Sequence, residues 1–235
     1  MRLLPRALFS AGLILALSTT ATYSGTVPLS GPGFDCGWSA SWDASLDGLV
    51  DVVAQGQVGG ICVIEKAAEF TQGPSLLTGL FPSIVITFTQ TTQNAAPVIA
   101  INDEILTNST GVLWTDFHMI IVDDGDAVFD PAATAASGGG GPIGWTIGPQ
   151  FTNAAFSDGD TRLDIFDGPG VPDGTQWFPG DGATNGELFV NLATHDIDGG
   201  EAPLVWSLKE TPTPEPGTLA LLALGGGLAA ARRRR

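Results

Sequence analysis

The stretch Ile84-Val85-Ile86-Thr87-Phe88-Thr89 decides the fold class of this chain. A large apolar residue occupies every second position, and two of the three positions between them are threonine. Successive side chains of a strand point to opposite faces, so this period of two predicts a strand with one face in a core. The same alternation recurs further along the chain, at Phe117–Val122, Arg162–Ile165, Glu187–Leu192 and Leu204–Lys209, and Leu49–Ala54 and Val98–Ile101 are further candidate strands.

Asp-Gly and Asn-Gly pairs separate these segments and supply the positive φ values that tight turns need. The pattern predicts an all-β fold over residues 25–210, an antiparallel β-sandwich or jelly-roll-like single domain with six to nine short strands. Helical periodicity is scarce. Residues Glu65–Phe70 are expected to form one or two helical turns, and residues 137–142, with four consecutive glycines, a flexible loop.

The charge balance excludes one broad class of function. The chain has 235 residues, 43% of them hydrophobic, with 9 Lys and Arg against 25 Asp and Glu. Six of the basic residues lie in the first ten and last four positions, so the body keeps only Lys66, Arg162 and Lys209. Because proteins bind nucleic acid by neutralising its phosphates with Lys and Arg, no nucleic-acid partner is expected.

The first 24 residues have the three parts of a secretory signal peptide. Two arginines within the first six residues precede an apolar run over residues 7–17, and small or hydroxyl residues follow to Ser24. The apolar run is too short for the roughly 20 residues of a membrane-spanning helix. Residues 1–24 are therefore predicted to form a signal helix that directs export and is then cleaved by signal peptidase.

The C-terminus has the reverse order of segments. Residues 211–216 alternate proline with threonine or glutamate, which predicts an extended, semi-rigid spacer after a domain that ends at Glu210. Residues 218–231 are apolar on all sides and predict a hydrophobic transmembrane helix. The four arginines Arg232, Arg233, Arg234 and Arg235 follow directly and are expected to hold the tail on the cytoplasmic side.

Together, Pro214-Glu215-Pro216, the apolar helix and the arginine cluster make residues 214–235 resemble the PEP-CTERM sorting signal of Gram-negative bacteria. The resemblance implies that a membrane-embedded exosortase recognises the signal, removes the tail and passes the protein to the cell surface. It also implies a transient stay in the inner membrane and, in many such bacteria, the production of exopolysaccharide. It implies nothing about the activity of the preceding domain.

Cys36 and Cys62 are the only cysteines of the chain. In an exported protein an even pair predicts a disulfide, with free thiols as the alternative. A disulfide closing a loop of this length stabilises a fold by about 3 kcal/mol.

The acidic loops are the densest group of candidate ligands. Asp123, Asp124, Asp126 and Asp130 place several hard oxygen donors close together after a predicted strand, which favours calcium as a possible cofactor. The alternative is that these residues form turns and keep the protein soluble.

The tryptophans offer the other candidate ligand site. Trp177 lies in the loop Thr175–Asp181, between Pro, Gly and Asp residues, and is predicted to be exposed, where its ring could stack on a sugar.

No residue is assigned to catalysis, because His118 and His195 both have the surroundings of surface histidines and no nucleophile motif is present. The sequence therefore predicts a non-enzymatic protein of the cell envelope or extracellular matrix. The alternatives are a carbohydrate-binding module and a polysaccharide hydrolase.

Overall fold

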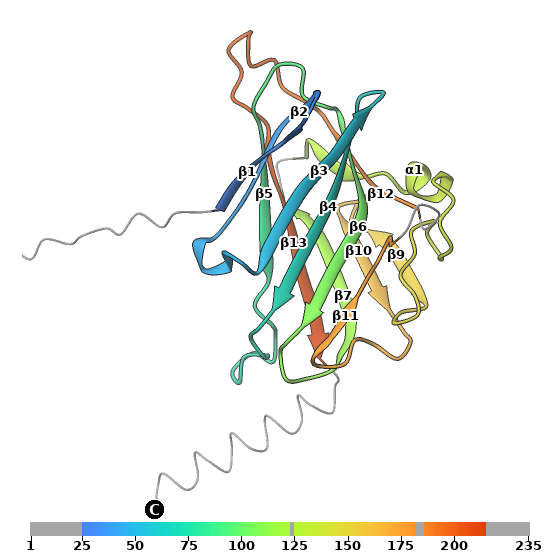
Figure 1. The fold of residues 1–235 in the computed structure, drawn as a ribbon. Helices are drawn as coiled ribbons and strands as arrows, with labels where there is room; N and C mark the ends of the chain where they lie inside the picture. Colours follow the sequence, from blue (N-terminus) through green and yellow to red (C-terminus); the bar gives the residue numbers. More distant parts are fainter. Residues whose placement is uncertain (1–24, 123–124, 182–185, 215–235) are drawn as a thin grey trace, which may run out of the picture.

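Alternating apolar and polar residues build two β-sheets that share one core (Figure 1). The structure is a computed structural model and describes residues 25–122, 125–181 and 186–214. The larger sheet has the order β1 (Gly25–Gly31), β2 (Phe34–Trp42), β5 (Ile84–Gln90), β13 (Val205–Pro214), β7 (Trp114–Val122), β10 (Arg162–Phe166) and β9 (Asn153–Ser157). The smaller sheet has the order β3 (Val50–Val58), β4 (Ile61–Phe70), β6 (Val98–Asn108), β12 (Leu188–Leu192) and β8 (Ala127–Phe129), with β11 (Thr175–Trp177) also paired to β6.

The core between the sheets is rich in aromatic rings. Phe88 of β5 stacks on Trp206 of β13, with ring centroids 4.3 Å apart, and Phe70 of β4 meets Trp114 of β7 edge to face. The second pair joins the two sheets. All six tryptophans of the chain are buried. The all-β fold predicted from the sequence is confirmed, and only two short helices interrupt the strands of the described part, η1 (Ala44–Leu46) and α1 (Pro131–Ala136).

One strand pair departs from the antiparallel prediction. Strands β4 and β6 run parallel, because the chain between them crosses to the larger sheet, forms β5 there and returns. The other paired strands of the described part are antiparallel. Asn102 is an extra residue in β6, opposite the step from Ile64 to Glu65 in β4. This bulge turns Asp103 outward and Glu104 inward.

The helical turns predicted over residues 65–70 are wrong. These residues form the second half of β4, in which every second side chain is buried. The prediction failed because one of the inward positions carries the charged residue Lys66, which is 3% exposed and hides the apolar alternation. Residues 137–142 follow α1, and no helix or strand includes them.

The spacer predicted over residues 211–216 needs a correction at its start. Residues 211–214 are extended, as expected, but they belong to β13 and pair with β7 as far as Pro214. Proline lacks an N–H group and is therefore suited to positions where the ladder needs no donor. The domain thus extends beyond Glu210 and includes the first proline of the Pro-Glu-Pro motif.

The remaining predictions about the two ends fall outside the described residues. These are the signal helix over residues 1–24, and Glu215, Pro216 and the four terminal arginines. Within the described part, no helix has the length and apolar character needed to cross a membrane. The transmembrane helix predicted over residues 218–231 lies beyond that part.

Candidate functional site

The C-terminal end of β13 is the point where the folded domain meets the predicted sorting signal. Strand β13 lies between β5 and β7 in the larger sheet: residues 205–210 pair with β5, and residues 207–214 pair with β7. Thr211 Oγ1 lies 2.7 Å from the hydroxyl of Ser83, in the segment that leads into β5. Removing β13 would therefore separate the two halves of the larger sheet.

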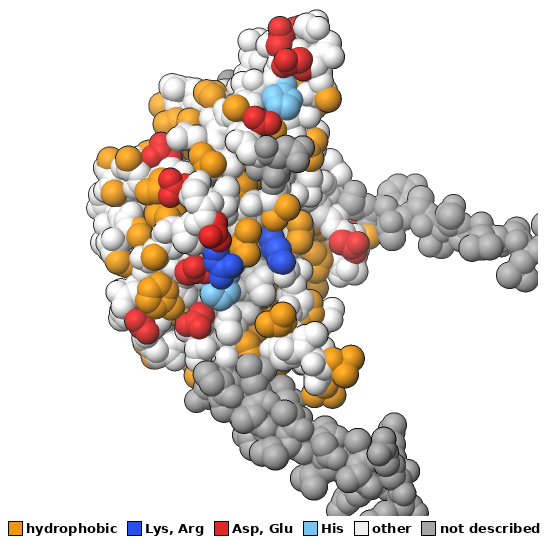
Figure 2. Space-filling view, turned by 180° about the vertical axis from the view of Figure 1, so that it is seen from behind, with side chains coloured by type: hydrophobic (Ala, Val, Ile, Leu, Met, Phe, Trp, Pro, Cys, Tyr) orange, Lys and Arg blue, Asp and Glu red, His pale blue; other side chains and the backbone are white. Residues whose placement is uncertain are grey.

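His118 of β7 fixes the last residues of this strand. Its Nε2 lies 2.8 Å from Thr213 Oγ1, and its Nδ1 lies 2.6 Å from Asp164 Oδ1 of β10. Arg162 Nε donates to both oxygens of the same carboxylate, at 2.7 and 3.0 Å. Figure 2 shows the outer face of the larger sheet, where basic and histidine side chains gather among carboxylates and exposed hydrophobic side chains.

A hydroxyl, an imidazole and a carboxylate in this order is also the arrangement of a hydrolase triad. Here, however, Thr213 is held in the extended ladder between β13 and β7 and faces outward from the sheet, whereas a triad nucleophile is usually presented by a sharp turn. The guanidinium of Arg162 also binds the carboxylate of Asp164. These contacts tie β7, β10 and β13 together. We therefore assign the group a structural role, which is to hold the end of β13 in place.

A fully buried charge cluster lies inside the sandwich. Lys66 Nζ contacts the carboxylates of Glu104 and Glu210, and the side chains of all three residues are inaccessible to solvent. Burial, together with the neighbouring charge of Glu210, raises the pKa of Glu104 well above its ordinary value, although Lys66 opposes the shift. Burial lowers the pKa of Lys66, but the two carboxylates outweigh it and leave that pKa raised. The sequence analysis gave these residues no role.

The outer face of the smaller sheet carries a groove of about 310 Å³ across β3, β4 and β6, the three strands that face the viewer in Figure 1. We call it the acidic groove, because solvent-accessible carboxylates and apolar side chains line it together. The carboxylates are Asp51, Glu65, Asp103 and Asp181, and the apolar side chains are Val53, Ala67, Ile105 and Phe178. Phe178 is 39% exposed, so its ring is accessible in the groove.

The loop after β11 forms one wall of this groove. Glu104 N donates to Pro179 O, and Gly180 N donates to Thr146 O. Gly180 has φ +74°, and a Cβ atom there would lie 2.2 Å from Asn102 O, in the bulge of β6. Only glycine allows this approach, which holds Phe178 and Asp181 against the sheet.

Two carboxylates face each other on neighbouring strands of the groove. Glu65 of β4 and Asp103 of β6 are register partners. Partial burial and the charge of Asp103 raise the pKa of Glu65, while a hydrogen bond from Gln55 opposes the shift. The pair can accept hydrogen bonds from hydroxyl groups of a bound molecule.

The predicted exposure of Trp177 is wrong. The residue is fully buried, because Thr175–Trp177 forms the short strand β11 on β6 and the third side chain of that strand points inward. Its Nε1 donates to Ile147 O at 2.9 Å, and its ring meets Phe117 and Phe151 edge to face. The accessible aromatic ring of this segment is that of the next residue, Phe178.

The predicted calcium ligands have other partners where the structure describes them. Asp130 Oδ1 accepts a hydrogen bond from Ala133 N and caps α1, and its Oδ2 accepts one from Asn191 Nδ2. Asp126 Oδ2 lies 3.3 Å from His195 Nε2. Asp123 and Asp124 lie outside the described residues. Within the described part of the chain, no group of three or more His, Cys, Asp or Glu residues could hold a metal ion.

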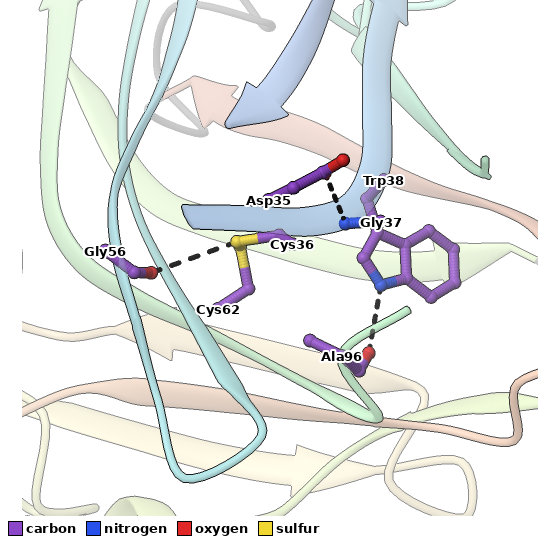
Figure 3. Close-up of a disulfide and its surroundings, with 7 residues drawn as sticks. All are labelled: Asp35, Cys36, Gly37, Trp38, Gly56, Cys62 and Ala96. Carbon is purple, nitrogen blue, oxygen red and sulfur yellow. Dashed lines mark hydrogen bonds between the residues drawn. A yellow bond between two sulfur atoms is a disulfide. The ribbon is translucent and has the colours of Figure 1, made fainter. Parts of the chain in front are cut away.

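Cys36 and Cys62 form a disulfide that joins β2 of the larger sheet to β4 of the smaller one (Figure 3). Their Cα atoms lie 5.5 Å apart, and both residues are fully buried. Beside the disulfide, Trp38 Nε1 donates to Ala96 O at 2.9 Å. Gly37, with φ +74°, allows the backbone of Ala95 to approach β2, since a Cβ atom would lie 2.5 Å from its Cα.

Comparison with known proteins gives one match. The family model described as the PEP-CTERM protein-sorting motif matches residues 212–235. No curated protein and no solved structure matches the chain. The sorting signal predicted at the C-terminus is thus confirmed, and it marks an exported protein that an exosortase sorts toward the cell surface. The match begins at Pro212, inside β13.

Proposed function

We propose that the protein is a non-enzymatic component of the cell envelope or extracellular matrix of a Gram-negative bacterium, built on a jelly-roll-like sandwich domain. The single observation that supports this best is the PEP-CTERM match over residues 212–235, at the end of a strand that the domain cannot lose. Signal peptidase removes residues 1–24. The exosortase then cuts the C-terminal signal while the tail holds the protein in the inner membrane, and the domain reaches the surface.

The position of Pro214 sets a limit on this cut. Residues 205–214 form β13, whose last four residues pair with β7 alone, so a cut before Pro214 would remove part of the larger sheet. Only residues 215–217 separate Pro214 from the apolar segment, and three extended residues span about 10 Å. The folded domain therefore lies close to the bilayer surface when the exosortase acts.

Intact mass and cell fraction in the natural host test this proposal. In a wild-type strain we expect a mature chain that lacks residues 1–24 and most of the tail but retains Pro214, in the surface or extracellular fraction. In a strain without exosortase, we expect the tail to remain and the protein to stay in the inner membrane. A variant that ends at Pro214 is the matched control and should be released without anchoring. Retention of the tail in the wild-type strain would contradict the proposal.

We propose the acidic groove as a saccharide-binding site, which is a second candidate function. Phe178 offers an apolar ring for the C–H face of a sugar, and the surrounding carboxylates can accept hydrogen bonds from its hydroxyl groups. The candidate ligand is the exopolysaccharide of the same host. This proposal replaces the stacking role that the sequence suggested for the buried Trp177.

Affinity electrophoresis in gels that contain the purified exopolysaccharide tests this site. We expect Phe178→Ala to weaken binding about tenfold, which corresponds to about 1.4 kcal/mol. Asp103→Asn tests the carboxylate side of the groove. Val205→Ala is the control, because it shortens another exposed apolar residue far from the groove lining. If Phe178→Ala and Val205→Ala migrate alike, the groove is not the saccharide site.

A further inference from the structure

An uncharged loop over residues 71–83 connects β4 to β5 and presents three exposed leucines. Leu76 is 71% exposed, Leu77 96% and Leu80 63%. We call these three residues the leucine tip. The next residue, Phe81, is buried and attaches the loop to the core. Three large apolar side chains on one short loop are unusual on a surface that is otherwise rich in carboxylates.

The loop is closed by its own hydrogen bonds. Ser75 N donates to Leu80 O at 2.9 Å, and Gly79 N donates to Ser75 O at 2.7 Å. The side chain of Ser75 accepts a further bond from Leu77 N. Four backbone N–H groups, those of Ser75, Leu77, Gly79 and Leu80, thus have acceptors within the loop, which lowers the cost of placing the tip in an apolar environment.

The leucine tip lies at the same end of the sandwich as the C-terminal end of β13. Figure 1 shows the loop between β4 and β5 projecting at the end where β13 finishes. The contact between Ser83 and Thr211, at 2.7 Å, joins the end of this loop directly to the last residues of β13. The apolar part of the sorting signal begins at residue 218, four positions after the strand.

We propose that the leucine tip inserts into the lipid bilayer that holds the sorting signal. It enters the leaflet that faces the domain and so orients the domain before cleavage. This inference rests on the proposed function, because it needs the tail to hold the domain at the membrane. The rest of the body has 24 acidic residues against three basic ones and is repelled by anionic lipid, whereas residues 71–83 carry no charge. Leucine favours the hydrocarbon region, and apolar contact at the interface needs no basic residues.

Tryptophan fluorescence of the full chain in vesicles tests the insertion. The vesicles contain phosphatidylcholine and phosphatidylethanolamine, with or without bromine atoms on the acyl chains. Leu77→Trp places a ring in the leucine tip, and Val58→Trp places one at a 72% exposed position, the last residue of β3 before its turn into β4. The six native tryptophans are buried and provide a constant background.

We expect brominated lipid to reduce the emission of the added tryptophan at least twofold in Leu77→Trp and to leave that of Val58→Trp unchanged. Equal responses of the two variants would overturn the proposal. A response of Leu77→Trp that disappears when each vesicle carries a single chain would overturn it as well, because contact of the tip with lipid would then depend on a second copy of the chain.

Processing in the host separates this inference from the function on which it rests. The vesicle experiment needs no exosortase, so it reports on the tip alone. Substitution of all three leucines by serine should reduce the rate of tail removal several-fold while the final mass stays the same. Normal quenching together with a retained tail in the wild-type strain contradicts the sorting function only. Absent quenching together with normal processing contradicts the leucine tip only.

Discussion

Lys66 of β4 forms an ion pair with Glu210 of β13 across the interface between the two sheets, with both side chains fully buried. Glu104 of β6 contacts the same ammonium group. Burial of a charge is costly unless a partner of opposite sign compensates it, so the three residues depend on one another. The cluster links the smaller sheet to the strand that ends at the sorting signal.

Removal of the lysine should be strongly destabilising. Lys66→Met leaves Glu104 and Glu210 side by side in the core without a cation, and we expect the free energy of unfolding to fall by about 3–5 kcal/mol. Urea unfolding at pH 7, without reductant, measures it. The triple variant Lys66→Met, Glu104→Leu and Glu210→Leu should recover most of this loss, since apolar side chains of similar volume have no charge to desolvate. A loss below about 1 kcal/mol in Lys66→Met would contradict this account.

The raised pKa of Glu104 predicts a dependence of stability on pH. Burial and the nearby Glu210 make the folded protein hold this proton more tightly than the unfolded chain, whose glutamate has a pKa near 4.5. The stabilisation that this bound proton provides is therefore fully present below about pH 4.5. It is lost as the pH rises through the raised pKa of Glu104 in the folded protein. Glu104→Gln keeps the hydrogen-bonding shape without the titration and should flatten this decline.

Urea unfolding of both proteins between pH 4.5 and pH 8 measures the effect. Glu65 and Glu187 also have raised pKa values, so some decline should remain in Glu104→Gln. Lys66 also has a raised pKa, but it stays charged below its ordinary value of 10.5 and does not contribute in this range. Parallel curves for the two proteins would show that Glu104 does not carry the dependence.

The disulfide should contribute a comparable share of stability. It joins β2 to β4, strands of different sheets, and closes a loop with a sequence separation of 26 residues. Replacement of Cys36 and Cys62 by alanine should lower the free energy of unfolding by about 3 kcal/mol, chiefly because the unfolded chain gains freedom. Urea unfolding of the double variant measures the loss. Reduction of the wild-type protein is the matched control, and an unchanged midpoint after complete reduction would contradict the prediction.

Strands were predictable from the sequence where the alternation was strict, as in β5 and β7. The prediction from alternation failed for β4, because Lys66 faces inward and its partners Glu104 and Glu210 come from distant parts of the chain. No local pattern can reveal such compensation. The bulge at Asn102 similarly reverses the alternation of β6 and hides most of that strand.

The candidate sites also differ in whether their residues are neighbours in the sequence. The sorting signal is a continuous segment, so its order of residues could be recognised directly. The acidic groove combines residues of three strands with Phe178 from a distant loop, and only the fold brings them together. Trp177 and Phe178 are neighbours with opposite environments, and the pairing of β11 with β6, which decides between them, has no local signal in the sequence.

The hydroxyl of Thr213 should secure the end of the domain next to the sorting signal. It lies 2.8 Å from His118 Nε2, and the loss of one such hydrogen bond costs about 1 kcal/mol. We expect Thr213→Val to speed amide hydrogen exchange about fivefold in peptides that cover β13, because the strand end opens more often. Thr213→Ser keeps the hydroxyl and is the control. Because the strand end opens more often, Thr213→Val should also make β13 more sensitive to proteases. Equal exchange in the valine and serine variants would show that His118 does not hold the strand through this hydroxyl.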